Sequence, residues 1–224
     1  MTDPTARFVE LVERPDDAIP LDEAALLIAA HDHPVDVGAS LAELDRLAAG
    51  ITATGIADLA RALFVDAGFG GDVAAYHDPR NSYLDEVLRR RLGMPITLSV
   101  VMIEVGRRCG VECVGVGMPG HFLVGGDDGF VDPFHAGVPL DAAGARQLFD
   151  RLRPGAPFVP AYLDPVGPRA ILARILANLV ASFSTRAPLS ATWALRLRLA
   201  IPGIAPAERA EGEALLARLR ARLN

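Results

Sequence analysis

Two polar residues stand where predicted strands would expose them. His121 follows the Pro119-Gly120 turn at the start of one strand, and Asp132 ends the next strand, just before Pro133. Because a short hairpin joins the two strands, we expect the two side chains to be cross-strand neighbours. A carboxylate beside an imidazole fixes its tautomer and raises its basicity, as in a nucleophile–histidine–aspartate relay. The structural alternative is that His121 simply opens a strand and Asp132 closes a turn.

The third element of such a relay is the start of an apolar helix predicted over 95–108. Its first backbone amides, over 96–98, point out of the helix and favour an anion or a polarised carbonyl. Thr97 and Ser99 carry hydroxyls near this end, and His121 could activate either one as a nucleophile. Thr97 is the better placed of the two. A hydroxyl inside a helix more often bonds a preceding carbonyl, so a structural role stays open for both.

The two cysteines are poorly placed to act as the nucleophile. Cys109 lies fourteen positions after Pro95 in the same predicted helix. At ~1.5 Å rise per residue it would be roughly 21 Å from the helix start, whereas a hydrogen bond to the base needs about 3 Å. Cys113 falls on the following strand, where we expect a core thiol.

A metal site is a further alternative. His121, Asp132 and His135 could converge, with His77 as another ligand, and such a set with an open position would suit catalytic zinc. No close ligand spacing supports it, so we predict no metal ligand. The sequence also lacks CxxC pairs, HExxH, Walker-type and GxGxxG motifs, so we expect no cofactor.

Composition excludes several classes of function. The chain has 224 residues, of which 51% are hydrophobic, and its formal net charge is −6, which argues against a nucleic-acid partner. All 22 basic residues are Arg, so no lysine can form a Schiff base. No apolar run is long enough to span a bilayer, and no secretory signal is visible. Two closely spaced cysteines suit a reducing compartment, and we expect a cytoplasmic protein without a membrane partner.

The elements that position these residues fall into three parts. Residues 1–67 read as helical, with helices starting at Pro20-Leu21 and, capped by Ser40, at about 41. Residues 68–150 hold the buried helix, a helix over 83–92 and three antiparallel strands within 111–132. Residues 151–224 comprise an irregular Pro-rich connector over 154–168 and a helical tail that should pack on the domain before it. One buried helix followed by a meander predicts an α+β fold.

Four motifs, in order along the chain, resemble the bacterial SirB family. They are YHDPRNSYL at 76–84, RLGMPITLS at 91–99, GMPGHFLV at 117–124 and VDPF at 131–134. That family belongs to the transglutaminase-like superfamily, whose fold is related to papain-type cysteine proteases. The resemblance therefore implies a papain/transglutaminase-like domain with a helical N-terminal part. It also implies that the tail helices are similar to a tetratricopeptide-like unit.

The resemblance also implies roles for individual residues. His121 matches the superfamily histidine and Asp132 the aspartate, but the catalytic Cys falls on Pro95 or Ile96, and neither is a nucleophile. If Pro95 is the match, a backbone N–H that could help form an oxyanion hole is lost as well. We therefore expect a domain without the thiol, acting as a binding or regulatory module and not as an enzyme.

The expected ligand is a peptide segment, or a small acyl or amide group, of a protein or peptide partner. The residues expected to contact it are Asn81, Pro95, Ile96, Ser99 and Gly120.

Two rival functions follow from the same residues. In the first, the protein is a hydrolase or acyl-transfer enzyme that uses Thr97, Ser99 or a metal-bound water, with His121 as base and Asp132 as its orienting partner. In the second, the tail helices dock a partner protein through an exposed apolar patch near Trp193, and the front domain is a scaffold.

Overall fold

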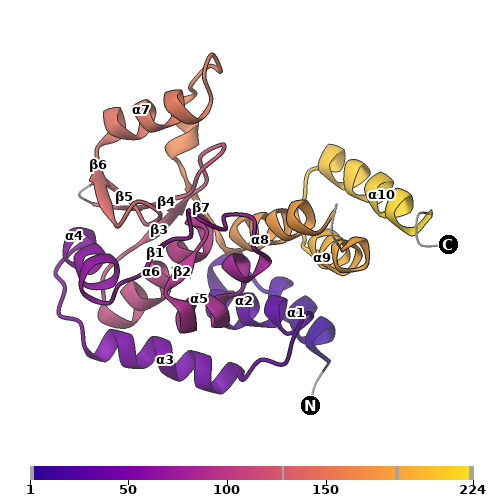
Figure 1. Ribbon diagram of the computed structural model, residues 1–224, viewed down its shortest axis with the longest axis horizontal. Helices are drawn as coiled ribbons and strands as arrows, with labels where there is room; N and C mark the ends of the chain where they lie inside the picture. The colour runs from indigo at the N-terminus through magenta and orange to yellow at the C-terminus, as the bar shows by residue number, and fades with distance from the viewer. Residues whose placement is uncertain (1–2, 128, 185–186, 222–224) are drawn as a thin grey trace.

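Helix α6 (Pro95–Cys109) runs through the middle of the computed structural model, which describes residues 3–127, 129–184 and 187–221 (Figure 1). Pro95 occupies the first turn, where its missing N–H costs no helical hydrogen bond. Gly110 ends the helix in the left-handed conformation, at φ 76°. Eleven of the fifteen residues of α6 are buried, so other elements must cover it on every side. The predicted apolar helix is confirmed.

The N-terminal part has four helices. They are α1 (Pro4–Val12), α2 (Leu21–Ala29), α3 (Val37–Ala49) and α4 (Ile56–Ala60), which continues into a π-helical turn, Arg61–Asp66. Helices α2, α3 and α4 pack against α6, and α1 packs on α2. A short 3-10 turn, Asp16–Ala18, connects α1 to α2. The sequence predicted Ser40 as a cap, but α3 begins three residues earlier. The Asp36 carboxylate caps it by accepting from the Ala39 N–H at 2.9 Å.

A short two-stranded sheet lies beside the start of α6. β1 (Gly70–Gly71) pairs in parallel with β2 (Leu92–Gly93). Between them lie a 3-10 turn, Pro79–Ser82, and α5 (Leu84–Arg90). The sequence predicted that this helix runs to Leu92. It stops at Arg90 because Arg91 adopts the left-handed conformation, at φ 61°, and the chain turns into β2.

The main sheet has five antiparallel strands in the order β6-β5-β4-β3-β7. The strands are β3 (Val114–Val116), β4 (Leu123–Gly126), β5 (Gly129–Asp132), β6 (Val138–Leu140) and β7 (Pro165–Val166). The predicted meander corresponds to β3, β4 and β5. Strands β6 and β7 were not expected from the sequence. β7 lies inside the Pro-rich connector, and its Pro165 is tolerated because the strand is at the edge of the sheet.

Each face of this sheet packs on a helix. Val124 and Val131 belong to the same buried cluster as α6. Val116 and Leu123 lie in a smaller cluster on the other face, together with Phe149 of α7 (Ala142–Leu152). A 3-10 turn, Pro160–Leu163, follows α7 and leads into β7. One helix on each face of an antiparallel sheet gives the predicted α+β fold.

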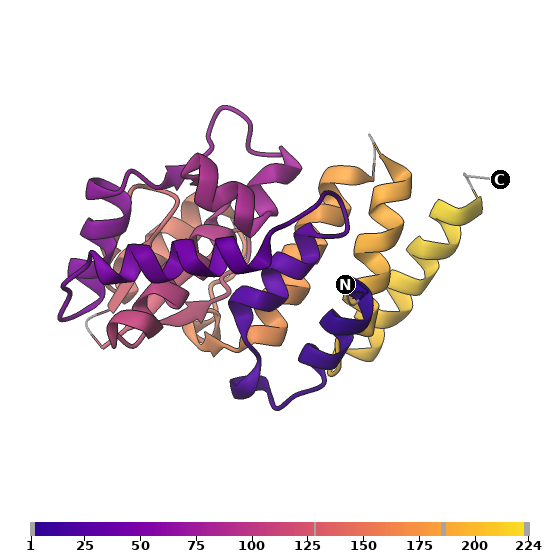
Figure 2. The same cartoon turned by 90° about the horizontal axis from the view of Figure 1, so that it is seen from below.

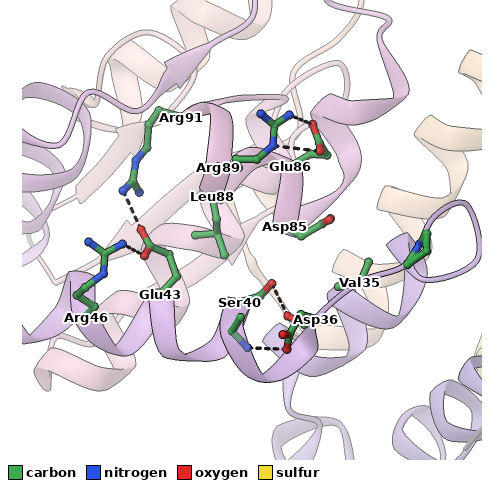
Figure 3. Close-up of a pocket in the computed structure, with 12 residues that line it drawn as sticks. Val35, Asp36, Ser40, Glu43, Arg46, Asp85, Glu86, Leu88, Arg89 and Arg91 are labelled. Atoms are coloured by element: carbon green, nitrogen blue, oxygen red, sulfur yellow. Dashed lines mark hydrogen bonds and ion pairs between the residues drawn. The ribbon is translucent and has the colours of Figure 1, made fainter. Parts of the chain in front are cut away.

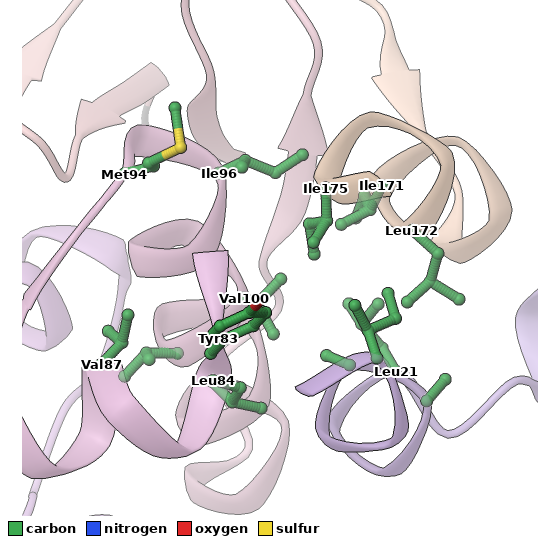
Figure 4. Close-up of a cluster of buried hydrophobic side chains, with 14 of the residues drawn as sticks. Leu21, Tyr83, Leu84, Val87, Met94, Ile96, Val100, Ile171, Leu172 and Ile175 are labelled. Carbon is green, nitrogen blue, oxygen red and sulfur yellow. The ribbon is translucent and has the colours of Figure 1, made fainter. Parts of the chain in front are cut away.

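The C-terminal part consists of α8 (Pro168–Phe183), α9 (Pro188–Ala200) and α10 (Pro206–Ala221). Ile171, Leu172 and Ile175 of α8 point toward α2 and the start of α6, so α8 closes the main core (Figure 4). α9 and α10 extend from α8, with α10 outermost (Figure 2). Their likeness to a tetratricopeptide unit stays a prediction. Among the helices of the described segments, none is both long and apolar enough to cross a bilayer.

The buried charges of α6 are neutralised locally. Glu104 is 3% exposed, and Arg108 donates to its carboxylate at 2.8 Å. Arg108 also contacts Asp22 of α2 at 2.7 Å and Asp45 of α3 at 2.7 Å. A buried charge is tolerated when it is paired and hydrogen-bonded, so this cluster ties the N-terminal helices to α6.

Leu172→Ala tests whether α8 is part of the main core. Leu172 is fully buried, and its truncation leaves a cavity, so we expect the free energy of unfolding to fall by about 2–5 kcal/mol. Urea denaturation followed by circular dichroism measures this. Leu189→Ala, at a position 67% exposed, should stay within about 0.5 kcal/mol of the parent. Equal losses in the free energy of unfolding for the two substitutions would contradict the packing of α8 in the main core.

Candidate functional site

A tight turn presents His121 to the start of α6. The His121 N–H donates to the Met118 carbonyl at 3.0 Å, and Gly120 between them has φ 86°. A side chain at Gly120 would be strained there, so the turn favours glycine. The His121 residue is only 5% exposed and lies two residues before β4 begins. The prediction that it opens the strand is therefore wrong by two residues.

Asp132 ends β5 and is buried beside His121. The register of β4 and β5 places Val124 opposite Val131, so the turn before β4, which carries His121, lies beside the end of β5. His121 Nε2 is 2.8 Å from Asp132 Oδ1. His135 Nδ1 is 2.7 Å from Asp132 Oδ2. His121 and Asp132 are thus hydrogen-bonded neighbours, as expected, and the His135 imidazole also contacts the same carboxylate.

The hydrogen bonds of Asp132 fix its charge. Burial raises the pKa of its carboxyl, but hydrogen bonds and charge from His121 and His135 outweigh burial, so the pKa lies below its usual range. The backbone N–H groups of Phe134 and His135 also donate to Oδ1, at 3.1 and 3.3 Å. An ionised carboxylate only accepts, so His121 donates from Nε2. In the neutral ring Nδ1 is then the acceptor nitrogen.

His121 borders a cavity of about 190 Å³ at the N-terminal end of α6. This volume is below the ~300–1,000 Å³ of drug-sized ligand sites, so it suits a small group only. The first helical hydrogen bond from an amide of α6 is Leu98 N–H to the Met94 carbonyl, which leaves the Ile96 amide without a helical partner. The cavity is lined by Tyr76, Pro95, Ile96, Gly120, His121, Phe122, Arg174 and Asn178.

Three residues that the sequence indicated for this site do not line the cavity. Thr97 is fully buried, and its hydroxyl has no partner among the described residues. The Ser99 hydroxyl donates to the Pro95 carbonyl at 2.8 Å, as the structural alternative predicted. Asn81 is fully buried and donates to the Ala75 carbonyl at 2.8 Å, so it holds the preceding loop. Pro95, Ile96, Gly120 and His121 do meet at the cavity.

Two polar residues of α8 at the cavity escaped the sequence analysis. Arg174 and Asn178 are four residues apart, so they share one face of the helix. The apolar stripe of α8 correctly predicted which face is buried, but no role was assigned to the polar residues beside it. A signal was present in the spacing itself, because an arginine and an asparagine flank the stripe one turn apart.

The cysteines are remote from this cavity. Cys109 lies at the other end of α6 and donates to the Ala48 carbonyl at 3.5 Å. Burial raises the pKa of Cys109, and it raises that of Cys113 to about 11, with further contributions from Cys109 and Glu112. A high pKa suppresses the thiolate, so neither sulfur is prepared for attack.

Three of the four residues considered as metal ligands lie close together. One ligand atom from each of His121, Asp132 and His135 lies within 4.8 Å of the others, while His77 is not in this group. Each imidazole nitrogen concerned is already hydrogen-bonded to an oxygen of Asp132, which accounts for their proximity. Metal binding therefore stays an alternative without further support.

Two other surfaces are less suited to bind a ligand. A hollow of about 450 Å³ between α3 and α5 carries many charges, but its arginines pair with its glutamates (Figure 3). Glu43 contacts both Arg46 and Arg91, and Arg89 contacts Glu86 at 2.6 Å. Trp193, expected at an exposed patch, is half-buried and stacks on His31 with ring centroids 5.4 Å apart.

Comparison with known proteins places this geometry in a family. The model of a family described as the transglutaminase-like superfamily matches residues 35–177, which include α6, the sheet and every residue that lines the cavity except Asn178. The chain belongs to the transglutaminase-like superfamily. The expected transglutaminase-like domain with an α+β fold is therefore confirmed, while the match of His121 and Asp132 to catalytic positions stays a prediction.

Curated relatives share most of this chain. A UPF0162 protein of Xylella fastidiosa is 41% identical over 188 residues, covering 73% of this chain and 65% of the relative. A UPF0162 protein of Pseudomonas aeruginosa is 37% identical over 171 residues, covering 71% and 63%. F-box only protein 21 of the mouse is 29% identical over 124 residues, only 19% of its length. The chain thus spans under two thirds of these relatives. No solved structure gives a significant match.

Asp132→Asn tests the buried carboxylate. Because its folded pKa is depressed, Asp132 contributes stability above its unfolded pKa of about 3.9, and this is lost as pH falls through the folded value. We expect the substitution to cost about 1–3 kcal/mol at pH 7 and to flatten the stability profile below pH 5. Urea denaturation across pH 3–7 measures both. Asp127→Asn, at an exposed position, is the control and should change neither.

Ile96→Cys tests whether the start of α6 faces His121. The helix N-terminus and the imidazole should lower the pKa of the new thiol below the ordinary value of about 8.5. At pH 7 we expect iodoacetamide to alkylate it at least about tenfold faster than Cys109 and Cys113, followed by mass spectrometry. Adding His121→Ala should remove most of the gain. Equal alkylation rates at all three thiols would refute this geometry.

Proposed function

We propose that this protein is a non-catalytic ligand-binding module of the transglutaminase-like superfamily, within its SirB family. In this proposal the cavity beside His121 holds a small acyl or amide group of a peptide or protein partner. The observation that carries it is the lining of the cavity. Pro95 and Ile96 face the cavity with His121, and no thiol, serine or threonine is among its described lining residues. A histidine–aspartate pair without a serine, threonine or cysteine beside it can bind a polar group but lacks the nucleophile that such a pair usually activates.

The positions of the hydroxyls support binding over the rival hydrolase. Ser99 is committed to a backbone carbonyl, and Thr97 does not line the cavity. The relay therefore has a base and an orienting carboxylate, but the one side-chain hydroxyl among the described lining residues is that of Tyr76, and burial raises the pKa of this phenol. The occurrence of related sequence over 19% of a long F-box protein also favours a module that serves within larger proteins.

The cavity offers groups suited to a peptide. The Ile96 amide and the Asn178 side chain can donate to a carbonyl, and His121 Nδ1 can accept from an N–H. Tyr76 and Phe122 provide aromatic walls. A small volume with a few polar groups on apolar walls is the usual composition of a recognition site.

The test uses two fragments, N-acetylglycine and N-acetylglycinamide. We expect at least one to bind with a millimolar dissociation constant, shifting the NMR signals of the His121 imidazole and the Ile96 methyl groups. Ile96→Trp should fill the cavity and abolish binding, whereas Leu189→Trp, at an exposed site, should not. The shifts in the parent protein keep the test valid if Ile96→Trp fails to fold.

Two outcomes would contradict the proposal. One is the absence of any shift with both fragments up to about 50 mM, well above a millimolar dissociation constant. The other is hydrolysis of p-nitrophenyl acetate, with or without added zinc, that His121→Ala abolishes. The second result would establish the rival hydrolase.

A further inference from the structure

Arg174 is a partly buried cation without an acidic partner among the described residues. Arg90 and Arg108 line buried regions as well and each has one: Arg90 contacts Asp72 at 2.9 Å, and Arg108 contacts Asp22 at 2.7 Å. Arg169 and Arg209 donate to backbone carbonyls, as Arg174 does. Burial lowers the pKa of Arg174, an effect that the nearby Tyr76 opposes. An unpaired cation in such a place loses hydration without a compensating charge, so an anion at the cavity would stabilise it.

The hydrogen bonds of Arg174 leave one part of its guanidinium free. Nη2 donates to the Met118 and His121 carbonyls, both at 2.9 Å, and so braces the turn that carries His121. Of the five guanidinium N–H groups, the three on Nε and Nη1 have no acceptor among the described residues. The side chain also lies over the Phe122 ring, 5.7 Å from its centroid.

The cavity holds further donors for the same ligand. Asn178, one turn along α8, lines it, and its amide has no hydrogen-bond partner among the described residues. The Ile96 amide approaches from α6 and adds the positive end of a fifteen-residue helix. The carboxylate of Asp132 lies behind the His121 ring, on Nε2, and is already engaged by four donors.

We infer that the cavity recognises a carboxylate group, which Arg174 and Asn178 contact from α8 while the Ile96 amide contacts it from α6. This inference rests on the proposed binding function and names its ligand class. A planar carboxylate matches the remaining guanidinium N–H groups, and one cation balances one negative charge. A phosphate dianion would meet only one cation in a cavity of about 190 Å³.

The carboxylate has three possible sources: a free small acid, a peptide C-terminus, and an acidic side chain. Acetate, N-acetylglycine and N-acetylaspartate α-amide represent them in that order, and N-acetylglycinamide is the neutral isostere of the second. We expect N-acetylglycine to bind at least about tenfold more tightly than N-acetylglycinamide, as measured by NMR titration. The order of the three acids then distinguishes the sources.

Asn178→Asp is the decisive variant because it preserves size and adds a negative charge inside the cavity. It should remove the preference for N-acetylglycine, so that the acid binds no more tightly than N-acetylglycinamide in the same variant. Gln147→Glu, which adds the same charge at an exposed position of α7, should keep the preference. Arg174→Gln should also abolish the preference for N-acetylglycine, but this variant additionally removes hydrogen bonds that hold the His121 turn.

The outcomes separate the two proposals. If neither N-acetylglycine nor N-acetylglycinamide binds, the proposed function fails and the carboxylate inference fails with it. If both bind with equal affinity, the binding function stands and the carboxylate inference is overturned. A preference for N-acetylglycine that persists in Asn178→Asp would also overturn the carboxylate inference, because the ligand carboxylate would then bind outside this cavity.

Discussion

Burial of α6 on all sides is the constraint from which the rest of the architecture follows. A helix with apolar residues around its whole circumference cannot lie on a surface, so it has to be enclosed. The N-terminal helices, the five-stranded sheet and α8 each cover part of it. Among the buried polar side chains of α6, Ser99 is hydrogen-bonded to the helix backbone and Glu104 is paired with Arg108, while the Thr97 hydroxyl has no partner among the described residues.

The enclosure also explains where a site can form. Only the ends of α6 reach the outside, and its N-terminal end meets the turn before β4, where His121 is held. Pro95 and Ile96 line the cavity at this junction, and neither side chain carries a nucleophilic atom. The proposed binding function depends on that composition, because a covalent intermediate needs an attacking atom.

The C-terminal part is coupled to the site through α8. Arg174 donates to two carbonyls of the turn that presents His121, so the position of the imidazole depends on a helix more than fifty residues away in sequence. The same helix buries Leu172 in the main core. A ligand that contacts Arg174 would therefore affect both the His121 turn and α8, because the guanidinium that joins them would also bind the ligand.

Local sequence was sufficient for α6 and for the histidine–aspartate pair. Pro95 and Gly110 set the ends of the helix through their own backbone preferences, and a short hairpin necessarily brings His121 close to Asp132. Local sequence did not predict β7, the Asp36 cap of α3, or the part of the cavity lining that α8 supplies. The period of α8 shows which face is apolar but not what its polar face meets. Only packing against the sheet and α6 brings Arg174 and Asn178 to His121, because that contact joins segments far apart in the chain.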